Sequence, residues 1–358
     1  MSVARHARPI LIGIDIGTAR IKALGVALDG SELALVEQAT PWARTGNQAE
    51  MDPAVLAGLI RAIVAAIPAE VARADHGGVQ VVAIGVTGMA EAGVLLDERG
   101  RALGRILAWH DPRGDVDVVR REIGEDVFER ASGMPLTAQP SLPKILWSRR
   151  AADTAASAVR FLSLPEWGVY CLGGLPVSEL SLASRTGLLD IGALAPFEGA
   201  VALLGRNLLA ELVVAGSAAG VANGDAVAAS IRGAVLTVAG HDHQAAALAV
   251  GAARPGELFN SMGTAEALVR CVAGPLDSAA VGRLAAQGTT AGRGVVRGCY
   301  AVMEGLRTGL VLERVASLLG AHDRPARRLL GEEAHAVDLA NIPLGLVVND
   351  GDTGELMI

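Results

Sequence analysis

The stretch GIDIGT, residues 13–18, ends the first apolar run of the sequence, PILIGIDIGT (9–18). A second run, RIKALGVALD (20–29), follows almost at once, and a third, ELALVEQAT (32–40), comes after the dipeptide Asp29-Gly30. Asp-Gly is typical of the short turns that join antiparallel strands. The pattern therefore predicts three short strands that fold back on one another at the start of the chain.

The next segments predict a helix followed by a strand. Asp52 can cap a helix, and Pro53 suits its first position. Apolar residues then recur on one helical face, and the helix is expected to end or bend near Ile67-Pro68. The run VQVVAIGVTG (79–88) is almost continuously apolar, which is typical of a strand buried on both faces of a sheet. This order predicts an α/β fold.

A second series of elements begins after residue 235. LTVAGHD (236–242) predicts a strand and a loop, HQAAALAVGAA (243–253) predicts a helix, and ELFNSMGTAEALVRCV (257–272) predicts a hairpin. This order partly repeats the start of the chain, where a Gly-Thr turn also joins two strands, and it suggests a duplicated unit. The segment 120–230 mixes helical patches with Gly and Pro, and no strand order is predicted for it.

Length and composition limit the class of protein. A chain of 358 residues exceeds the size at which one core keeps growing, so two domains are expected. Hydrophobic residues make up 51% of the chain, but its most apolar stretches are shorter than the ~20 residues of a membrane-spanning helix, so we expect no membrane partner. The first residues lack the pattern of a signal peptide, which favours a cytoplasmic protein with its three cysteines reduced.

The charge of the chain favours a small-molecule partner. Its net charge is −7, only 3% of its residues are aromatic, and Lys and Arg form no cluster. These features argue against a nucleic-acid surface. Association into a homodimer is left open by the sequence.

The turn after the first predicted strand carries groups that suit phosphate. Gly17 lets backbone N–H groups approach phosphate oxygens, Thr18 can donate a hydrogen bond to them, and Asp15 can hold Mg²⁺ through water. The alternative is an ordinary turn with no chemistry. An oxidoreductase with a dinucleotide site is disfavoured, because GxGxxG is absent and a strand rather than a helix follows.

Asp242 lies at the expected start of the later helix, in the stretch AGHDHQ (239–244). The helix macrodipole favours an ionised carboxylate there, which suits a base that accepts a proton from a substrate hydroxyl in phosphoryl transfer. The alternative is a capping Asp without chemistry. His241 and His243 are expected to point to different sides with no third ligand nearby, which disfavours zinc. A second Gly-Thr turn, Gly263-Thr264, could clasp a triphosphate together with the first.

These motifs, in this order, resemble the FGGY carbohydrate kinases of the actin and hexokinase superfamily. The resemblance implies an α/β fold with an actin-like, ribonuclease H-like architecture of two lobes. It implies an enzyme that uses ATP and Mg²⁺ to phosphorylate a hydroxyl of a sugar or polyol. The segments that carry it are GIDIGTARIK (13–22), GVTGMAEAGVLLDERG (85–100), ILAWHDPR (106–113), PSLPKILW (140–147), LPEWGVYCLGG (164–174), SELSLASRTGLLDI (178–191), AGHDHQAAA (239–247) and SMGTAEALV (261–269).

The resemblance also implies roles for individual residues. Asp242 is the expected catalytic base, and Asp15 is expected to organise Mg²⁺ and to face Asp242 across the cleft between the lobes. The residues expected to line the phosphate path are Gly17, Thr18, Lys22, Gly263 and Thr264. Those expected to line the sugar pocket are Glu91, Trp109, Asp111 and Arg113.

The sequence departs from the family at several points. Xylulokinases have Gln-Met-His and glycerol kinases an Arg-Glu pair where this chain has Met89-Ala90-Glu91, so we expect a polyol or open-chain sugar that bonds to Glu91. Trp167 stands in place of the usual Asp of an LPxDY motif and is expected to pack. Family members continue beyond this sequence with a Gly-rich adenosine loop, whereas Asp350-Gly351-Asp352 is only a turn signal.

We therefore expect a sugar-binding lobe over residues 1–233 and a partial, incomplete nucleotide-binding lobe over residues 234–358. The alternative function is a catalytically inactive sugar-binding or regulatory fragment with the same fold.

Overall fold

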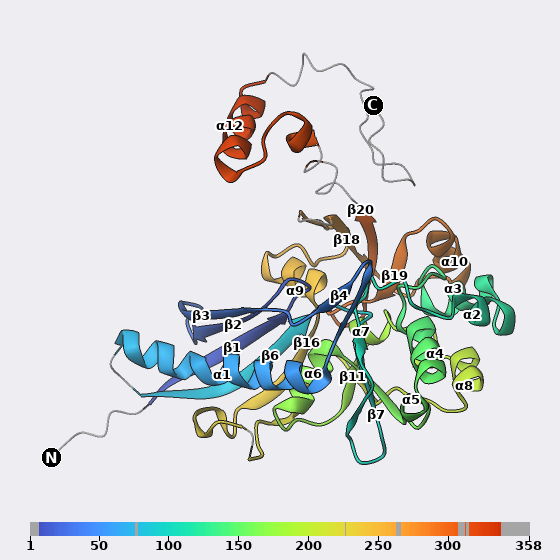
Figure 1. Cartoon of the computed structure of the whole chain (residues 1–358), viewed down its shortest axis with the longest axis horizontal. Coiled ribbons are helices and arrows are strands. Elements are labelled where there is room, and N and C mark those ends of the chain that lie inside the picture. Colours follow the sequence, from blue (N-terminus) through green and yellow to red (C-terminus); the bar gives the residue numbers. More distant parts are fainter. Residues whose placement is uncertain are drawn as a thin grey trace.

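The largest sheet of the molecule contains six strands in the order β15-β16-β6-β1-β2-β3 (Figure 1). The computed structural model describes residues 7–75, 78–225, 227–262, 266–306, 312 and 315–337. The three strands predicted at the start of the chain are confirmed, because β1, β2 and β3 pair antiparallel. The strands of this sheet are β1 (Arg8–Ile16), β2 (Arg20–Ala27), β3 (Glu32–Ala39), β6 (Val79–Gly88), β15 (Ala218–Val221) and β16 (Val235–His241).

The centre of this sheet is parallel. Strand β6, which occupies the predicted range 79–88, pairs in parallel with β1 on one side and with β16 on the other. At their carboxyl ends Asp15 lies opposite Thr87, and Thr87 lies opposite Gly240. Three segments that are far apart in sequence therefore end at one edge. The predicted division after residue 233 falls just before β16, which is hydrogen-bonded into this first sheet.

Helix α1 (Pro53–Asp75) packs along the sheet, and its first turn is capped as predicted, with the Ala54 N–H donating to Asp52 Oδ1 at 2.7 Å. The helix does not end at Pro68, because Val64, Ile67 and Val71 continue one buried stripe that the sheet covers, and this packing offsets the missing backbone hydrogen bond. Length and composition alone make α1 able to cross a membrane, but its apolar face lies in the core of this fold.

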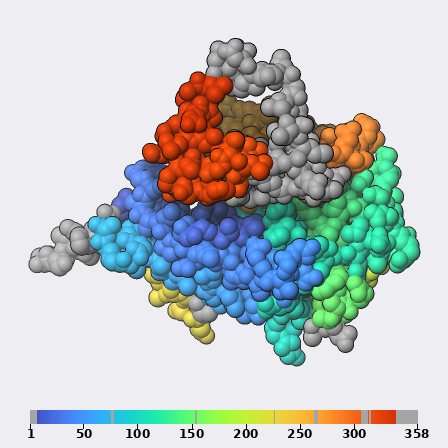
Figure 2. All heavy atoms as spheres, turned by 45° about the horizontal axis from the view of Figure 1, so that its top comes forward, coloured from blue at the N-terminus to red at the C-terminus, as the bar shows by residue number. Residues whose placement is uncertain are grey.

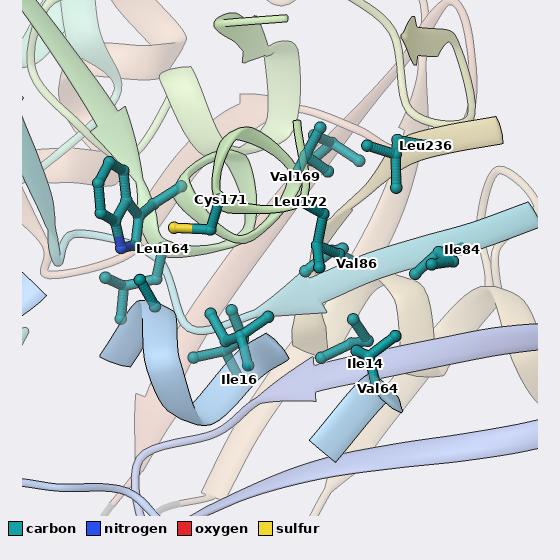
Figure 3. Packing of buried hydrophobic residues seen from close by; sticks show 14 of the residues in the cluster. Ile14, Ile16, Val64, Ile84, Val86, Leu164, Val169, Cys171, Leu172 and Leu236 are labelled. Atoms are coloured by element: carbon teal, nitrogen blue, oxygen red, sulfur yellow. The ribbon is translucent and has the colours of Figure 1, made fainter. Parts of the chain in front are cut away.

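The main core lies between this sheet and the helices that cover it. Ile14 and Ile16 of β1, Ile84 and Val86 of β6 and Leu236 of β16 pack against α6 (Leu164–Cys171) and α1 (Figure 3). Every second residue of β1 is buried, from Ile10 to Ile16, so Asp15 lies on the other face of the strand. The alternation thus keeps the Asp15 carboxylate out of the apolar core.

The rest of the segment between residues 40 and 233 adds short strands and helices, and part of it packs around a second core that contains Phe128, Leu142 and Leu189. Its strands are β4 (Ala43–Thr45), β5 (Gln48–Met51), β7 (Gly93–Leu96), β8 (Ala102–Leu103), β9 (Ile106–Leu107), β10 (Arg160–Ser163), β11 (Val177–Glu179), β12 (Leu189–Asp190), β13 (Ala195–Pro196) and β14 (Glu211–Val213). Its helices are α2 (Val116–Glu122), α3 (Glu125–Ser132), α4 (Ser141–Ala151), α5 (Asp153–Ala156), α7 (Leu180–Ala183), α8 (Glu198–Leu204) and the 3₁₀ helix η1 (Ala229–Ile231).

A four-stranded antiparallel sheet, β17-β18-β20-β19, follows helix α9 (Asp242–Ala249). The predicted hairpin is confirmed, because β17 and β18 pair from Ser261 opposite Ala267, while its turn lies outside the described residues. Helix α12 (Arg324–His335) buries none of its residues and stands out from the surface (Figure 2). The other elements here are β17 (Leu258–Ser261), β18 (Glu266–Ala273), α10 (Ser278–Ala286), β19 (Thr290–Arg293) and β20 (Cys299–Leu306).

The close approach of β6 to β1 depends on Gly88. A Cβ atom added at this position would lie 2.6 Å from the backbone oxygen of Ile16, whereas one added at Gly13 would meet no atom within 4 Å. We expect Gly88→Ala to lower the free energy of unfolding by about 1–3 kcal/mol through overpacking. Gly13→Ala is the control on the same sheet and should be neutral or stabilising by up to about 1 kcal/mol. Urea unfolding measures both, and equal effects would contradict this account of the strand ends.

Candidate active site

The carboxyl ends of β1, β6 and β16 bring together Asp15, Thr87 and the start of α9. The Thr87 hydroxyl donates to the Gly240 carbonyl at 2.7 Å, which ties the end of β6 to the end of β16. Gly240 has φ +96, and a Cβ atom there lies 2.5 Å from Val295 Cγ1 and 2.7 Å from Ser181 Oγ. Only glycine fits this position, where the chain leaves the sheet to begin α9 with Asp242.

Asp15 is half-buried, and its buried Oδ1 atom has no hydrogen-bond partner among the described residues. Burial and, to a smaller extent, the negative charge of Asp242 raise the pKa of the Asp15 carboxyl to about 6, against the opposing effects of Lys22 and His243. The two carboxylates are therefore close enough to repel each other. This arrangement is the one expected for a site that receives a cation.

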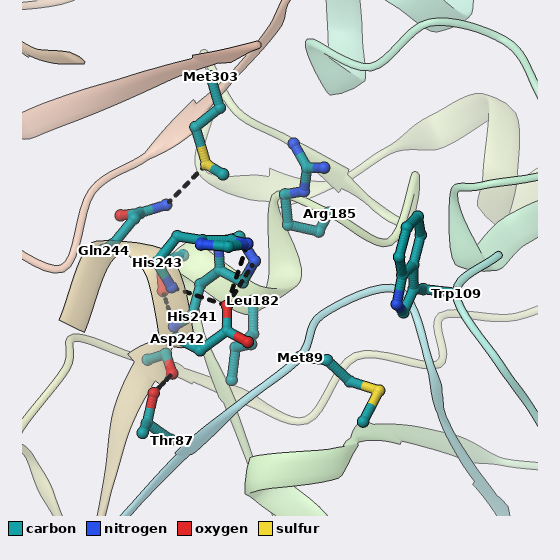
Figure 4. Close-up of polar contacts among 12 residues, drawn as sticks. Thr87, Met89, Trp109, Leu182, Arg185, His241, Asp242, His243, Gln244 and Met303 are labelled. Carbon is teal, nitrogen blue, oxygen red and sulfur yellow. Dashed lines mark hydrogen bonds and ion pairs between the residues drawn. The ribbon is translucent and has the colours of Figure 1, made fainter. Parts of the chain in front are cut away.

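Asp242 is the first residue of α9, and three groups surround its Oδ1 atom. The His243 backbone N–H donates to it at 2.7 Å, His241 Nε2 lies 3.3 Å away and His243 Nε2 lies 3.9 Å away. The Asp242 side chain is 26% exposed, so a ligand can reach it. Figure 4 shows the two imidazoles gathered at this carboxylate, with Arg185 and Trp109 in the same view.

The expectation that the two histidines point to different sides is wrong. His241 precedes the helix and has an extended backbone (φ −66, ψ 133), so helical periodicity does not set its direction. The His241 and His243 rings instead meet edge to face with centroids 5.4 Å apart. Asp242 itself is the third potential ligand, which the prediction overlooked.

A buried chain of hydrogen bonds holds His241. Its backbone N–H donates to Ser181 Oγ at 3.0 Å, and Ser181 Oγ donates to Glu179 Oε2 at 2.5 Å. The Glu179 N–H in turn donates to Glu166 Oε1 at 2.7 Å. Burial raises the pKa of Glu166 to about 8 and that of Glu179 to about 6, and it lowers the pKa of His241 to about 3. Trp167, which follows Glu166 in the sequence, packs in the core as expected. The carboxylate that this segment buries belongs to Glu166.

Several residues of the predicted phosphate path lie around the first turn. A Cβ atom added at Gly17 would lie 2.9 Å from the Arg20 carbonyl oxygen, so the tight turn requires glycine. The Thr18 hydroxyl accepts a hydrogen bond from Trp109 Nε1 at 3.0 Å. Lys22 is exposed on β2 and acts on Asp15 through its charge. Gly263 and Thr264 lie outside the described residues.

Glu91 is buried and has φ 61, an uncommon backbone conformation for a residue other than glycine. Its Oε1 atom accepts hydrogen bonds from Arg185 Nε at 2.8 Å and from Gln139 Nε2 at 3.2 Å, and it also pairs with Arg185 Nη2. Arg185 Nη1 donates to Thr290 Oγ1 at 2.5 Å, which links Glu91 to strand β19. Backbone strain of this kind persists where the surroundings enforce it, often at functional sites.

Sequence reasoning assigned no role to Arg185 or Lys144, although both belong to quoted motifs, SRTG and PKILW. Lys144 is buried, and its ammonium donates to the carbonyls of Ala138 and Gln139, which fixes the loop that presents Gln139 to Glu91. Burial lowers the pKa of Lys144 to about 8. A basic residue inside an otherwise apolar motif was the available signal.

Asp111 and Arg113 form a network with each other and with Glu50. The Asp111 carboxylate accepts hydrogen bonds from the Ala49 N–H at 2.8 Å and from Arg113 Nη2 at 2.7 Å, and Arg113 Nη1 donates to Glu50 at 2.8 Å. These bonds lower the pKa of Asp111 against the opposing effect of its burial. The Arg113 guanidinium also stacks over Trp147. Both side chains therefore brace the loop that carries Trp109.

A sequence model of the FGGY family of carbohydrate kinases, N-terminal domain, matches residues 10–249 of the chain. The chain belongs to this family. Relatives in sequence include a glycerol kinase of Rhizorhabdus wittichii, 30% identical over 57% of this chain and 42% of the relative, and a xylulose kinase of Streptomyces coelicolor, 29% identical over 89% and 64%. The chain thus spans less than two thirds of the length of these FGGY relatives.

Solved FGGY structures share the fold. The xylulose kinase from Rhodospirillum rubrum has a TM-score of 0.78 and 25% identity, over 92% of this chain and 68% of that one. The Plasmodium falciparum glycerol kinase with ADP also has a TM-score of 0.78, at 17% identity, over 91% and 67%. The predicted fold class, an α/β fold of actin-like, two-lobed type, is confirmed by these likenesses.

The raised pKa of Asp15 predicts a pH-dependent stability. Between about pH 4 and 6 the folded protein holds a proton that the unfolded chain has lost, so this contribution to stability is present below pH 3.8 and lost as the pH rises through about 6. At pH 7.5 we expect Asp15→Asn to raise the free energy of unfolding by about 1–3 kcal/mol.

Urea unfolding at pH 5 and pH 7.5 checks this expectation, and the gain from Asp15→Asn should shrink at the lower pH. Asp117→Asn, on the exposed side chain of Asp117 in α2, controls for the loss of one negative charge. A destabilised Asp15→Asn variant at pH 7.5 would contradict the proposed repulsion.

Proposed function

We propose that the chain belongs to an ATP-dependent kinase that phosphorylates a hydroxyl group of a sugar or polyol. The observation that carries the proposal is the meeting of Asp15 and Asp242, which are close enough for the charge of one to raise the pKa of the other. Two carboxylates in one site are unfavourable unless a cation or a proton joins them. A cation beside Asp15 and the proton of an acceptor hydroxyl beside Asp242 relieve the repulsion between the two carboxylates.

Asp242 is the base in this mechanism. It accepts the proton of the acceptor hydroxyl while that oxygen forms a bond to the γ-phosphorus, and the bond from the γ-phosphorus to the ADP oxygen breaks. The proton ends on Asp242 and ADP leaves. Asp242 is the first residue of α9, and its contact with His241 orients the carboxylate.

The residues around Asp15 fit Mg²⁺ and a triphosphate. The buried Oδ1 atom of Asp15, which has no partner among the residues that the structure describes, suits a cation or its water shell. Mg-ATP supplies the γ-phosphoryl group when bound. The backbone at Gly17 and the Thr18 hydroxyl lie at the turn after β1, and the exposed Lys22 lies opposite Asp15 on β2. We assign the phosphate path to these three residues, together with Gly263 and Thr264.

The acceptor side of the site is assigned to Glu91 and Trp109. Arg185 pairs with Glu91 and orients its side chain, and we infer that a free lone pair of this carboxylate accepts a hydrogen bond from a substrate hydroxyl. Trp109 supplies an apolar wall, while Asp111 and Arg113 act on the substrate through the loop they brace. Relatives named for glycerol and xylulose support a polyhydroxy substrate.

The same proposal includes the division of the chain into lobes, its location in the cell and its partners. We infer a sugar-binding lobe up to residue 233, a nucleotide-binding lobe from residue 234, a cytoplasmic location and a small-molecule substrate without nucleic-acid or membrane partners. The alternative function, an inactive sugar-binding fragment, predicts polyol binding without release of ADP.

Replacement of the base separates catalysis from binding. We expect Asp242→Asn to lower transfer by about 10²–10⁴-fold, because the amide keeps the shape but accepts no proton. Polyol affinity, measured by calorimetry, should stay within a few-fold. Asp277→Asn is the matched control, since Asp277 also begins a helix but caps it at Ala280, away from the site. Release of ADP from MgATP with a polyol panel measures activity, and unchanged turnover in Asp242→Asn would place the base elsewhere.

Replacement of Glu91 tests the acceptor side. A hydrogen bond to a charged group contributes roughly 1.5–3 kcal/mol, so Glu91→Ala should weaken polyol binding about ten- to a hundredfold, and Glu91→Gln somewhat less. Loss of the partner of a buried arginine also destabilises the fold, so thermal unfolding must accompany the calorimetry. Glu70→Ala, on the exposed surface of α1, is the control. Unchanged affinity in folded Glu91→Ala would remove Glu91 from the sugar site.

A further inference from the structure

The imidazoles of His241 and His243 and the carboxylate of Asp242 each offer one ligand atom, and the three atoms lie within 4.8 Å of one another. Two ligands bound to one zinc-class ion at about 2.0–2.2 Å stand roughly 3–3.5 Å apart. His241 Nε2 and Asp242 Oδ1 already have this separation, at 3.3 Å. His243 Nε2 is 3.9 Å from Asp242 Oδ1, so a small shift of its ring completes the set.

The three ligands differ in how exposed and how firmly held they are, and both properties suit a site that an ion enters from solvent. His241 is 5% exposed in its side chain and is held by the hydrogen bond to Ser181, so it provides a fixed ligand. The His243 side chain is 34% exposed and can adjust. The exposed part of Asp242 gives an ion access from solvent and leaves room for water or a substrate oxygen as further ligands.

We propose that His241, Asp242 and His243 form a binding site for a divalent transition metal of the zinc class, and that the bound metal inhibits phosphoryl transfer. Two imidazole nitrogens and one carboxylate suit Zn²⁺, Co²⁺ or Ni²⁺, whereas Mg²⁺ prefers oxygen ligands in an octahedral arrangement. The site is therefore chemically distinct from the position assigned to Mg²⁺ at Asp15.

The inhibitory part of this inference rests on the proposed function. A carboxylate bound to a divalent metal shares its negative charge with the ion and is a weaker base, so the metal and the acceptor hydroxyl compete for Asp242. The binding part stands on the three ligands alone.

The second nitrogen of His241 limits the expected affinity. His241 Nδ1 is buried and has no hydrogen-bond partner among the described residues. Ligating histidines almost always use this nitrogen to bond a neighbouring acceptor, and loss of that bond typically weakens metal binding about 10–100-fold. The site is therefore suited to reversible regulation by metal rather than to a permanent structural ion.

Titration of the untagged, metal-free chain with Co²⁺ tests the binding part. Visible absorption reports entry into a nitrogen-containing site, and competition with Zn²⁺ reports its affinity. We expect one Co²⁺ per chain, displaced by Zn²⁺ and not by excess Mg²⁺. His243→Ala should raise the dissociation constant at least about tenfold, by loss of one of three ligands. His322→Ala, which removes a histidine outside this cluster, should change it less than about twofold.

Asp242→Asn, which keeps the shape of the side chain, should also weaken Co²⁺ binding and provides a second variant if His243→Ala fails to fold. The inference would be overturned if the wild type bound no Co²⁺, or if folded His243→Ala and Asp242→Asn both bound Co²⁺ as tightly as the wild type. In the transfer assay, Zn²⁺ should inhibit the wild type and EDTA should restore it. A chain that binds Co²⁺ but transfers no phosphate would overturn the proposed function and leave the metal site standing, whereas active, Zn²⁺-insensitive protein would overturn the inhibition alone.

Discussion

The parallel pairing of β1, β6 and β16 fixes the site, because it ends three distant segments at one edge of the sheet. Asp15 comes from the first strand, and Asp242 follows the third through the glycine turn at Gly240. The sheet thereby forces two carboxylates together, at a cost that appears in the raised pKa of Asp15. Because the two carboxylates repel each other, a cation bound between them is favoured. A site that favours a cation suits the phosphoryl transfer proposed above.

A second constraint joins the two sides of the site. Arg185 bonds Glu91 on one side and Thr290 of β19 on the other, so Glu91 and the later sheet are held by one side chain. Both charges are buried, and removal of either leaves the other unpaired. The strained backbone of Glu91 fits the same picture, because packing around Gln139 and Lys144 holds it in place.

The sequence predicted the features that have local signals and missed those that depend on tertiary contacts. The first three strands and the helix start at Asp52 followed from periodicity and capping, and β6 matched its predicted range, whereas β15 of the same sheet was not predicted. Strands of two to four residues, such as β12 and β14, carry no periodicity and could not be predicted. The meeting of His241 and His243 was missed because an extended residue before a helix does not follow helical geometry. Arg185 was missed because its partners lie about a hundred residues away on either side, at Glu91 and Thr290.

If Asp15 and Asp242 share one electrostatic site, the titration of the Asp15 carboxyl depends on the charge of Asp242. Carbon-13 NMR of carboxyl-labelled aspartates, with Asp15→Asn to assign the signal, gives this pKa in the metal-free protein. The account predicts a pKa of about 6 in the wild type and a lower value, still above 3.8, in Asp242→Asn, since burial continues to raise it. A pKa near 3.8 in the wild type, or a value that does not change in Asp242→Asn, would contradict the account.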